Sequence, residues 1–204
     1  MIDLERLPVA RTREFDEDTM LAKAMHAFRR QGFAGISIKE LEAATDLSAG
    51  SIYNSYGDKN GLFAAALAHY NRTVLARRLS DHASAEAGLE GLRSLFLSLL
   101  AEPGGGSYGC LITNTAIELG GDRPVPRAIC DGLRALSATF AARLTEAQSA
   151  AALRRRVDPQ LAAEKLLALY QGILVLVRAG HDKGPLATMI NAEFDGLKEP
   201  ADGA

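Results

Sequence analysis

Apolar side chains recur every three or four residues along most of this 204-residue chain. That spacing matches the turn of an α-helix, whereas a half-buried strand alternates apolar and polar positions. In the segment after Gly57 the apolar positions are Leu62, Phe63, Ala66, Leu67, Tyr70 and Val74. Because no segment alternates in the manner of a strand, the pattern predicts an all-α fold.

Helix start signals divide the N-terminal part of the chain into short helices. Ser37 is followed by Glu40 three positions later, which is the capping-box pattern. Ser48 offers a second N-cap. These signals predict helices at 38–45 and 48–56, joined by a tight turn. A supporting helix, a tight turn and a second short helix indicate a helix-turn-helix module.

Several side chains of this module are suited to contact DNA. Three small residues in the second helix, Ala49, Gly50 and Ser51, would let its backbone approach a groove closely. The amide of Asn54 is able to pair with adenine through two hydrogen bonds. The candidates for phosphate contacts are Ser37, Ser48, Tyr53, Tyr56 and Lys59.

These residues also have structural interpretations that do not involve DNA. Tyr53 fits a packed core position, and Asn54 fits a solvated polar position. Arg6, Arg11 and Arg13 fit either an arm in the minor groove or a disordered leader. The formal net charge of −2 does not distinguish between these interpretations.

The module resembles the N-terminal helix-turn-helix of TetR-family transcriptional repressors. The resemblance covers Phe28 to Leu67 and implies that Tyr53 and Lys59 contact DNA phosphates. The residues that carry it are Phe28, Gly32-Phe33, Ser37-Ile38, Leu41, Leu47-Ser48, Ile52-Tyr53, Tyr56, Lys59 and Leu62.

Two departures from the family pattern stand out. Ser55-Tyr56 replaces a common His-Phe pair, which removes one histidine contact to phosphate, and Thr45-Asp46 lies where glycine is more usual. The resemblance implies a three-helix DNA-binding module joined to a helical domain for ligand binding and dimerisation. We therefore expect a flexible arm at 1–15, a DNA-binding domain at 16–60, and an effector-sensing and dimerisation domain at 61–200.

The last two predicted helices are more apolar than one core contact requires. One begins at Asp158-Pro159, a cap followed by proline, and is apolar over 166–177. The other follows the break at Gly184-Pro185. We expect the helices around 160–180 and 185–197 to form a two-fold interface in a homodimer, which suits a palindromic double-stranded DNA operator. A wholly intramolecular core is the alternative.

A second distinctive segment contains Gly109-Cys110-Leu111, Asn114 and Glu118. We expect Cys110 in the first turn of a helix, where the helix dipole favours thiolate. The pattern resembles the TetR subgroup that includes the N-ethylmaleimide reductase repressor and a copper-responsive outer-membrane regulator. This implies that Cys110 senses electrophiles and oxidants. The effector and sensor candidates are Cys110, Tyr108, Asn114, Glu118 and Tyr170.

The same residues fit a sensor without thiol chemistry. Cysteine often packs as a small buried hydrophobe, in which case the effector would bind non-covalently in a hydrophobic pocket. Four aromatic residues fit either the edge of such a pocket or the core: Tyr108, Tyr170, Phe96 and Phe140.

The remaining features argue against other classes of protein. The sequence has no phosphate-binding glycine loop or nucleophile elbow, and neither cysteine belongs to a CxxC pair. We therefore expect no enzyme activity, no cofactor and no metal. No apolar run approaches the ~18 residues that span a bilayer, and the acidic N-terminus is unlike a signal peptide. A cytoplasmic protein is expected, and a helical adaptor that does not bind DNA is the alternative class.

Overall fold

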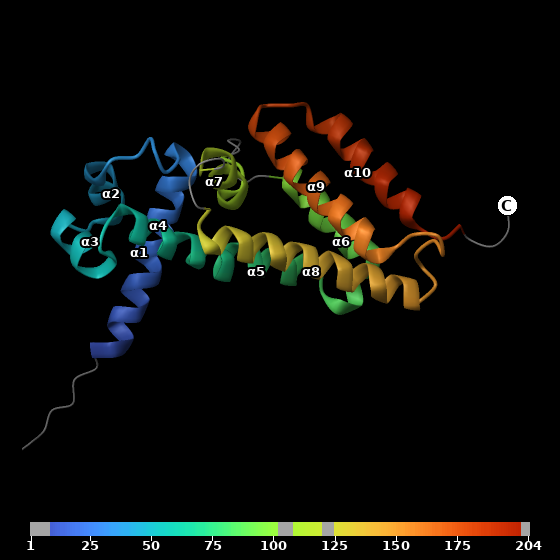
Figure 1. Cartoon of the computed structure of the whole chain (residues 1–204), viewed down its shortest axis with the longest axis horizontal. Helices are drawn as coiled ribbons and strands as arrows, with labels where there is room; N and C mark the ends of the chain where they lie inside the picture. Colours follow the sequence, from blue (N-terminus) through green and yellow to red (C-terminus); the bar gives the residue numbers. More distant parts are fainter. Residues whose placement is uncertain (1–8, 102–107, 120–124, 201–204) are drawn as a thin grey trace, which may run out of the picture. The chain divides into compact units, whose positions relative to one another are not determined.

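The computed structural model describes residues 9–101, 108–119 and 125–200, and these ranges are helical apart from their connections (Figure 1). The only extended pairing within these ranges is an isolated bridge between Leu153 and Lys198. The predicted all-α fold is confirmed. The chain divides into two compact units, residues 1–70 and 71–204.

Unit 1 packs its helices around three aromatic rings. The ring centroids of Phe28 and Phe63 lie 4.7 Å apart, and those of Phe33 and Phe63 lie 4.8 Å apart. Leu41 and Ile52 are fully buried, so the two short helices are anchored to the same core. The helices are α1 (Val9–Gln31), α2 (Ile38–Thr45), α3 (Ala49–Tyr56) and α4 (Lys59–Tyr70).

The start of α1 differs from the expectation. Residues 1–15 were expected to form a flexible arm, but α1 already begins at Val9. Residues 1–8 lie outside the described ranges.

The boundary between the units also falls later than the expected 60/61. The apolar side chains Leu62, Phe63, Ala66 and Leu67 of α4 are buried, and α4 packs mainly on α1 and α3. Since α4 completes the core of unit 1, the division falls after Tyr70.

Unit 2 has its own aromatic core. The ring of Phe96 lies 5.6 Å from Phe140, 5.3 Å from Tyr170 and 5.3 Å from Phe194. The four rings come from four different helices, so the cluster holds the unit together. The helices are α5 (Ala76–His82), α6 (Gly88–Leu97), α7 (Leu111–Leu119), α8 (Arg127–Ser149), α9 (Pro159–Arg178) and α10 (Lys183–Leu197).

The predicted fourth helix is not regular up to Val74. After α4, a π-helical segment, η1 (Asn71–Leu75), precedes α5. The Asn71 Nδ2 donates a hydrogen bond of 2.7 Å to the carbonyl of Ala128 in α8. A Cβ at Gly132 would lie 2.9 Å from the Asn71 Oδ1, so glycine permits this close approach. The wide turn thus coincides with a tight contact to α8.

The predicted start of α9 is confirmed, whereas α10 starts earlier than predicted. Asp158 caps α9 by accepting from the backbone N–H of Gln160, as predicted. Helix α10 begins at Lys183 with Asp182 as its cap, so Gly184-Pro185 lies inside its first turn and does not precede the helix. A proline is tolerated there because first-turn N–H groups have no intrahelical acceptor.

Helix α9 is both long and apolar. Within the described ranges, it alone is long and apolar enough to cross a membrane by length and composition. It also packs along α8 and buries Leu166, Tyr170 and Ile173 in the core of unit 2. The core of a folded unit therefore accounts for one side of this apolar helix.

Candidate nucleic-acid interface and sensor region

The start of α2 is the predicted capping box. The Ser37 hydroxyl accepts from the backbone N–H of Glu40 at 3.2 Å, and the Glu40 carboxylate accepts from the Ser37 N–H at 2.8 Å. The hydrogen bonds from the Ser37 backbone and side chain lower the pKa of Glu40 below its ordinary value. The Ser37 hydroxyl, expected to contact phosphate, therefore also has a structural role as a cap.

The turn between α2 and α3 needs a residue that tolerates the left-handed conformation. Asp46 has φ 61°, in the left-handed region that favours glycine. Aspartate tolerates this conformation better than most side chains. Its carboxylate also forms an ion pair with Lys23 of α1. The departure at Asp46 thus retains the required turn and adds a contact to α1.

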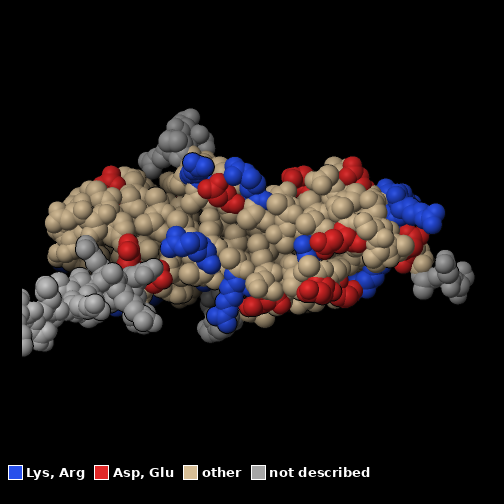
Figure 2. Space-filling view, turned by 90° about the horizontal axis from the view of Figure 1, so that it is seen from below, with Lys and Arg blue, Asp and Glu red and all other residues tan. Residues whose placement is uncertain are grey.

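The surface of α3 is polar but carries no charge. Its buried anchor is Ile52, while Tyr53 is 51% exposed and Asn54 is exposed beside it. Tyr53 therefore does not occupy the core position that was its alternative. The left end of Figure 2, on the side of α2 and α3, shows mostly uncharged surface.

The N-terminus of α3 is satisfied within the protein. The Ser48 hydroxyl accepts from the backbone N–H of Ser51 at 3.1 Å and lies 3.0 Å from the Ser51 hydroxyl. Ala49 is half-buried and Gly50 is exposed. A Cβ at Gly50 would meet only the Ser48 hydroxyl, at 3.8 Å, so the surface over this first turn is open.

Tyr56 differs from Tyr53 because its hydroxyl has a partner inside unit 1. It donates to the Glu17 carboxylate of α1 at 3.1 Å. Burial first, and then the Glu17 carboxylate, raise the pKa of Tyr56 to about 12. A hydroxyl that donates to Glu17 cannot donate its proton to a phosphate at the same time. Sequence spacing could not reveal this partner, which is 39 positions away.

Lys59 lies at the first position of α4, beside an N-terminal turn. Its Nζ lies 4.7 Å from the centroid of the Phe33 ring, within range of a cation–π interaction. Asp58 accepts from the backbone N–H of Gly61 at 2.8 Å. The Asn60 amide, followed by Gly61, lowers the pKa of Asp58. The Lys59 ammonium group is thus held near the N-terminus of α4, the helix that follows α3.

In unit 2, Cys110 is buried and immediately precedes α7, one position before the expected first turn. Its carbonyl accepts from the backbone N–H of Asn114 at 2.9 Å, so Cys110 opens the helix as its N-cap residue. It is 6% exposed. Cys130 is exposed on α8, and neither cysteine forms a disulfide.

The backbone before Cys110 is held by two side chains. The Tyr108 carbonyl accepts from the Asn114 Nδ2 at 2.7 Å and from the Arg178 Nη1 at 2.6 Å. Arg178 ends α9 and was not among the predicted sensor residues. Neither its charge nor its position marked it, because the contact spans 70 positions.

The other predicted sensor residues are dispersed. Tyr170 is buried in the aromatic core, where burial raises its pKa to about 12. Glu118 is exposed on α7, and Tyr108 is 45% exposed. The structure therefore joins Tyr108 to Asn114 by a hydrogen bond. Of the four aromatic residues, Phe96, Phe140 and Tyr170 are core residues.

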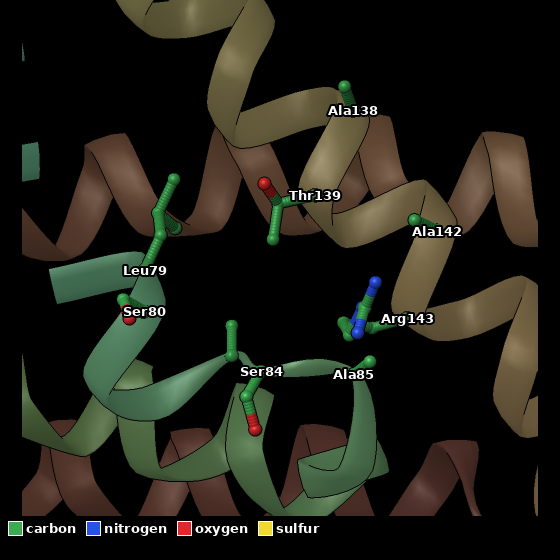
Figure 3. A pocket seen from close by; sticks show the side chains of 9 residues that line it. Leu79, Ser80, Ser84, Ala85, Ala138, Thr139, Ala142 and Arg143 are labelled. Atoms are coloured by element: carbon green, nitrogen blue, oxygen red, sulfur yellow. The ribbon is translucent and has the colours of Figure 1, made fainter. Parts of the chain in front are cut away.

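An open groove of about 460 Å³ lies elsewhere in unit 2. Figure 3 shows its two sides, one from the end of α5 and the following connection, the other from α8. None of the predicted sensor residues lines it. Its lining is Leu79, Ser80, Ala83, Ser84, Ala85, Ala138, Thr139, Ala142 and Arg143. In the part of the chain that the structure describes, no cluster of three or more His, Cys, Asp or Glu side chains is arranged to hold a metal ion.

A capped helix, a left-handed turn and an exposed second helix on a buried anchor define a helix-turn-helix DNA-binding protein. The model of the tetR family of bacterial regulatory proteins matches residues 20–66, and the tetracyclin repressor-like C-terminal domain matches residues 87–193. The chain belongs to the TetR family of bacterial transcriptional regulators, whose members are not enzymes. The resemblance of the helix-turn-helix module to TetR-family repressors is confirmed.

Curated relatives extend over most of the chain. It is 25% identical over 185 residues to the HTH-type transcriptional repressor DhaR of Mycobacterium sp. strain GP1, covering 87% of this chain and 90% of DhaR. It is 26% identical over 177 residues to the HTH-type transcriptional repressor ComR of Escherichia coli K12, covering 83% of each.

Solved structures share the fold. The reduced form of E. coli NemR superposes with a TM-score of 0.78 at 20% identity, covering 93% of this chain and 100% of NemR. CifR, solved as a cysteine-substituted variant with a 26-base-pair operator, gives a TM-score of 0.71 at 25% identity, covering 88% of this chain and 95% of CifR.

Proposed function

We propose that this protein is a repressor that binds a palindromic operator as a homodimer and is released by a small-molecule effector of unknown identity. The observation that carries the proposal is the outward face of α3, with Tyr53 and Asn54 exposed above the buried Ile52. Relatives named as repressors, and a similar protein solved on its operator, support it. We propose that it acts in the cytoplasm, without a membrane partner.

The proposed division of labour follows from the hydrogen bonds. Exposed Tyr53 and Lys59 contact phosphates, Asn54 reads a base edge, and the small first turn of α3 permits close approach. Ser37 and Tyr56 contribute less, because their hydroxyls already donate to the carboxylates of Glu40 and Glu17. The Ser48 hydroxyl also has a partner within unit 1, the Ser51 hydroxyl at 3.0 Å.

A Tyr53→Phe variant is expected to bind its operator about tenfold more weakly, because one phosphate hydrogen bond is lost in each half-site at roughly 0.5–1.5 kcal/mol each. The operator is first selected by the wild-type protein from random-sequence duplexes, and binding is measured by fluorescence anisotropy. Tyr56→Phe is the matched control and should stay within about threefold of wild type. Equal losses in both variants would contradict this assignment.

The proposed dimer uses α9 and α10. Both helices bury one side in unit 2, and their exposed sides carry large apolar residues among charged ones such as Glu164 and Lys165. Apolar surface of this extent on two adjacent helices favours a protein interface. A two-fold axis here would present two copies of α3 to the two halves of a palindrome. The exposed large apolar residues of this face are Leu161, Val175, Leu176 and Met189.

The proposed release step has two versions. In the first, a thiol-reactive effector modifies Cys110, which lies where α7 begins and next to the segment held by Arg178. Because the thiol is buried, the reaction would proceed through local opening. In the second, Cys110 is structural and a hydrophobic effector binds without a covalent bond. In either version the effector must favour the form that does not match the operator.

N-ethylmaleimide distinguishes the two versions. If Cys110 is the sensor, the reagent should lower wild-type operator affinity at least tenfold, since an allosteric coupling of about 1–3 kcal/mol is typical. Cys110→Ser should not respond. Cys130→Ser is the matched control, because it removes the exposed thiol and should respond like wild type. A response that is abolished by Cys130→Ser, or retained in Cys110→Ser, would contradict the assignment of Cys110 as the sensor. No response in the wild-type protein would leave the non-covalent version.

A further inference from the structure

Glu42 on α2 makes two hydrogen bonds that join the two helices of the helix-turn-helix. Its backbone carbonyl accepts from the N–H of Asp46, the residue that ends α2, at 3.0 Å. Its side-chain Oε1 accepts from the N–H of Ala49, the first residue of α3, seven positions later. One residue therefore both completes α2 and caps α3.

The other hydrogen bonds of the turn do not connect α2 to α3, as the bond between Glu42 and Ala49 does. The Thr45 hydroxyl donates to the Leu41 carbonyl at 2.6 Å, and the N–H of Leu47 approaches it at 3.4 Å. These contacts lie within α2 and the turn itself. The Ser48 cap lies within α3 and its own flank. Among the side-chain hydrogen bonds of this segment, that of Glu42 links the body of α2 to α3 directly.

The position of the carboxylate is electrostatically favourable for the helix. The first N–H groups of a helix lack intrahelical acceptors, and a negative charge there interacts well with the helix dipole. The same carboxylate would repel DNA phosphates if it pointed at them. Its negative charge weakens the general attraction of the protein to DNA. The orientation that the carboxylate gives α3 therefore has to compensate for this loss.

We propose that Glu42 is a positioning residue that fixes the direction of α3, and with it the directions of Tyr53 and Asn54, without touching DNA. This inference rests on the proposed operator binding. The N–H groups of Ala49 and Ser51 are both occupied by protein acceptors. The proposal therefore also explains why side chains, and not these backbone groups, contact the phosphates.

The test compares two substitutions of Glu42 on the operator selected by the wild-type protein. Glu42→Ala should weaken operator binding at least tenfold, because one charge-assisted hydrogen bond is lost in each subunit. Binding to an unrelated duplex should weaken much less, because only the specific alignment is lost. Glu42→Gln retains an acceptor oxygen and should bind within about threefold of wild type. If the carboxylate acted only by its charge, both substitutions would strengthen binding, which would overturn the proposal.

A substitution of the donor provides the second arm. Ala49→Pro removes the N–H at the first position of α3, where proline is well tolerated, and Ser48 already has an extended backbone with ψ 155°. In this background Glu42→Ala should cause no further loss beyond about twofold, because coupled residues are non-additive. A further tenfold loss would overturn the proposal. If the wild-type protein selects no duplex at all, the proposed function fails instead.

Discussion

A Gly172→Arg variant is expected to be a folded monomer that no longer binds its operator specifically. Gly172 is exposed on α9, and a Cβ added there would meet nothing within 4 Å. The protomer therefore has room for the side chain, and arginine has a better helix propensity than glycine. Stability of the isolated protomer should stay the same or rise slightly.

The same position lies on the proposed dimer face, beside Val175 and Leu176. In a two-fold interface every substitution is present twice, and an unpaired buried charge costs roughly 3–5 kcal/mol. We expect the dimer to dissociate at micromolar concentration and operator affinity to fall at least 100-fold, the factor that about 2.7 kcal/mol represents. Sedimentation velocity and anisotropy on the selected operator measure the two effects.

Ala135→Arg is the matched control. It adds the same side chain to the exposed face of α8, outside the proposed interface. It should remain dimeric and bind like wild type. If Gly172→Arg is still a dimer with unchanged affinity, the interface lies elsewhere and the assignment to α9 and α10 is wrong.

A Gly61→Ala variant is expected to lose the structure of unit 1. A Cβ at Gly61 would lie 1.8 Å from the Tyr56 carbonyl oxygen, which is backbone at the end of α3 and cannot rotate away. Either α3 or α4 must move. Overpacking of this kind costs about 3 kcal/mol, a large part of the stability of a small unit. Thermal unfolding and amide hydrogen exchange of α2 to α4 should both report the loss, and operator binding should disappear.

Gly50→Ala separates folding from DNA contact. In this first turn of α3 the nearest atom to an added Cβ is the Ser48 hydroxyl at 3.8 Å, so the fold should be retained with stability within about 1 kcal/mol of wild type. If α3 enters a groove, the added methyl group should still weaken operator binding.

A Gly61→Ala protein with wild-type melting and binding would refute the close packing of α3 on α4.

The features that sequence could predict are those set by neighbours in the chain. The Ser37–Glu40 box and the Asp158 cap depend on residues two or three positions apart, and both are confirmed. Helices α2 and α3 have nearly the expected bounds for the same reason. The all-α fold followed from a spacing that repeats over many turns.

What could not be predicted depends on partners far apart in the sequence. The hydroxyl of Tyr56 is occupied by Glu17, and the Tyr108 carbonyl by Arg178. The end of the regular α4 reflects the contact between Asn71 and Ala128. Pro185 suggested a break, but its ring is compatible with a first helical turn.

The shared acceptor at Tyr108 has a thermodynamic consequence. Asn114 of α7 and Arg178 of α9 donate to the same carbonyl oxygen, two residues before Cys110. If α9 forms the subunit interface, an effector that shifts this carbonyl changes the free energy of association. Linkage then works in both directions: dimer concentration sets the apparent affinity for the effector by the same factor. Diluting the protein and adding the effector would then shift the same equilibrium between monomer and dimer.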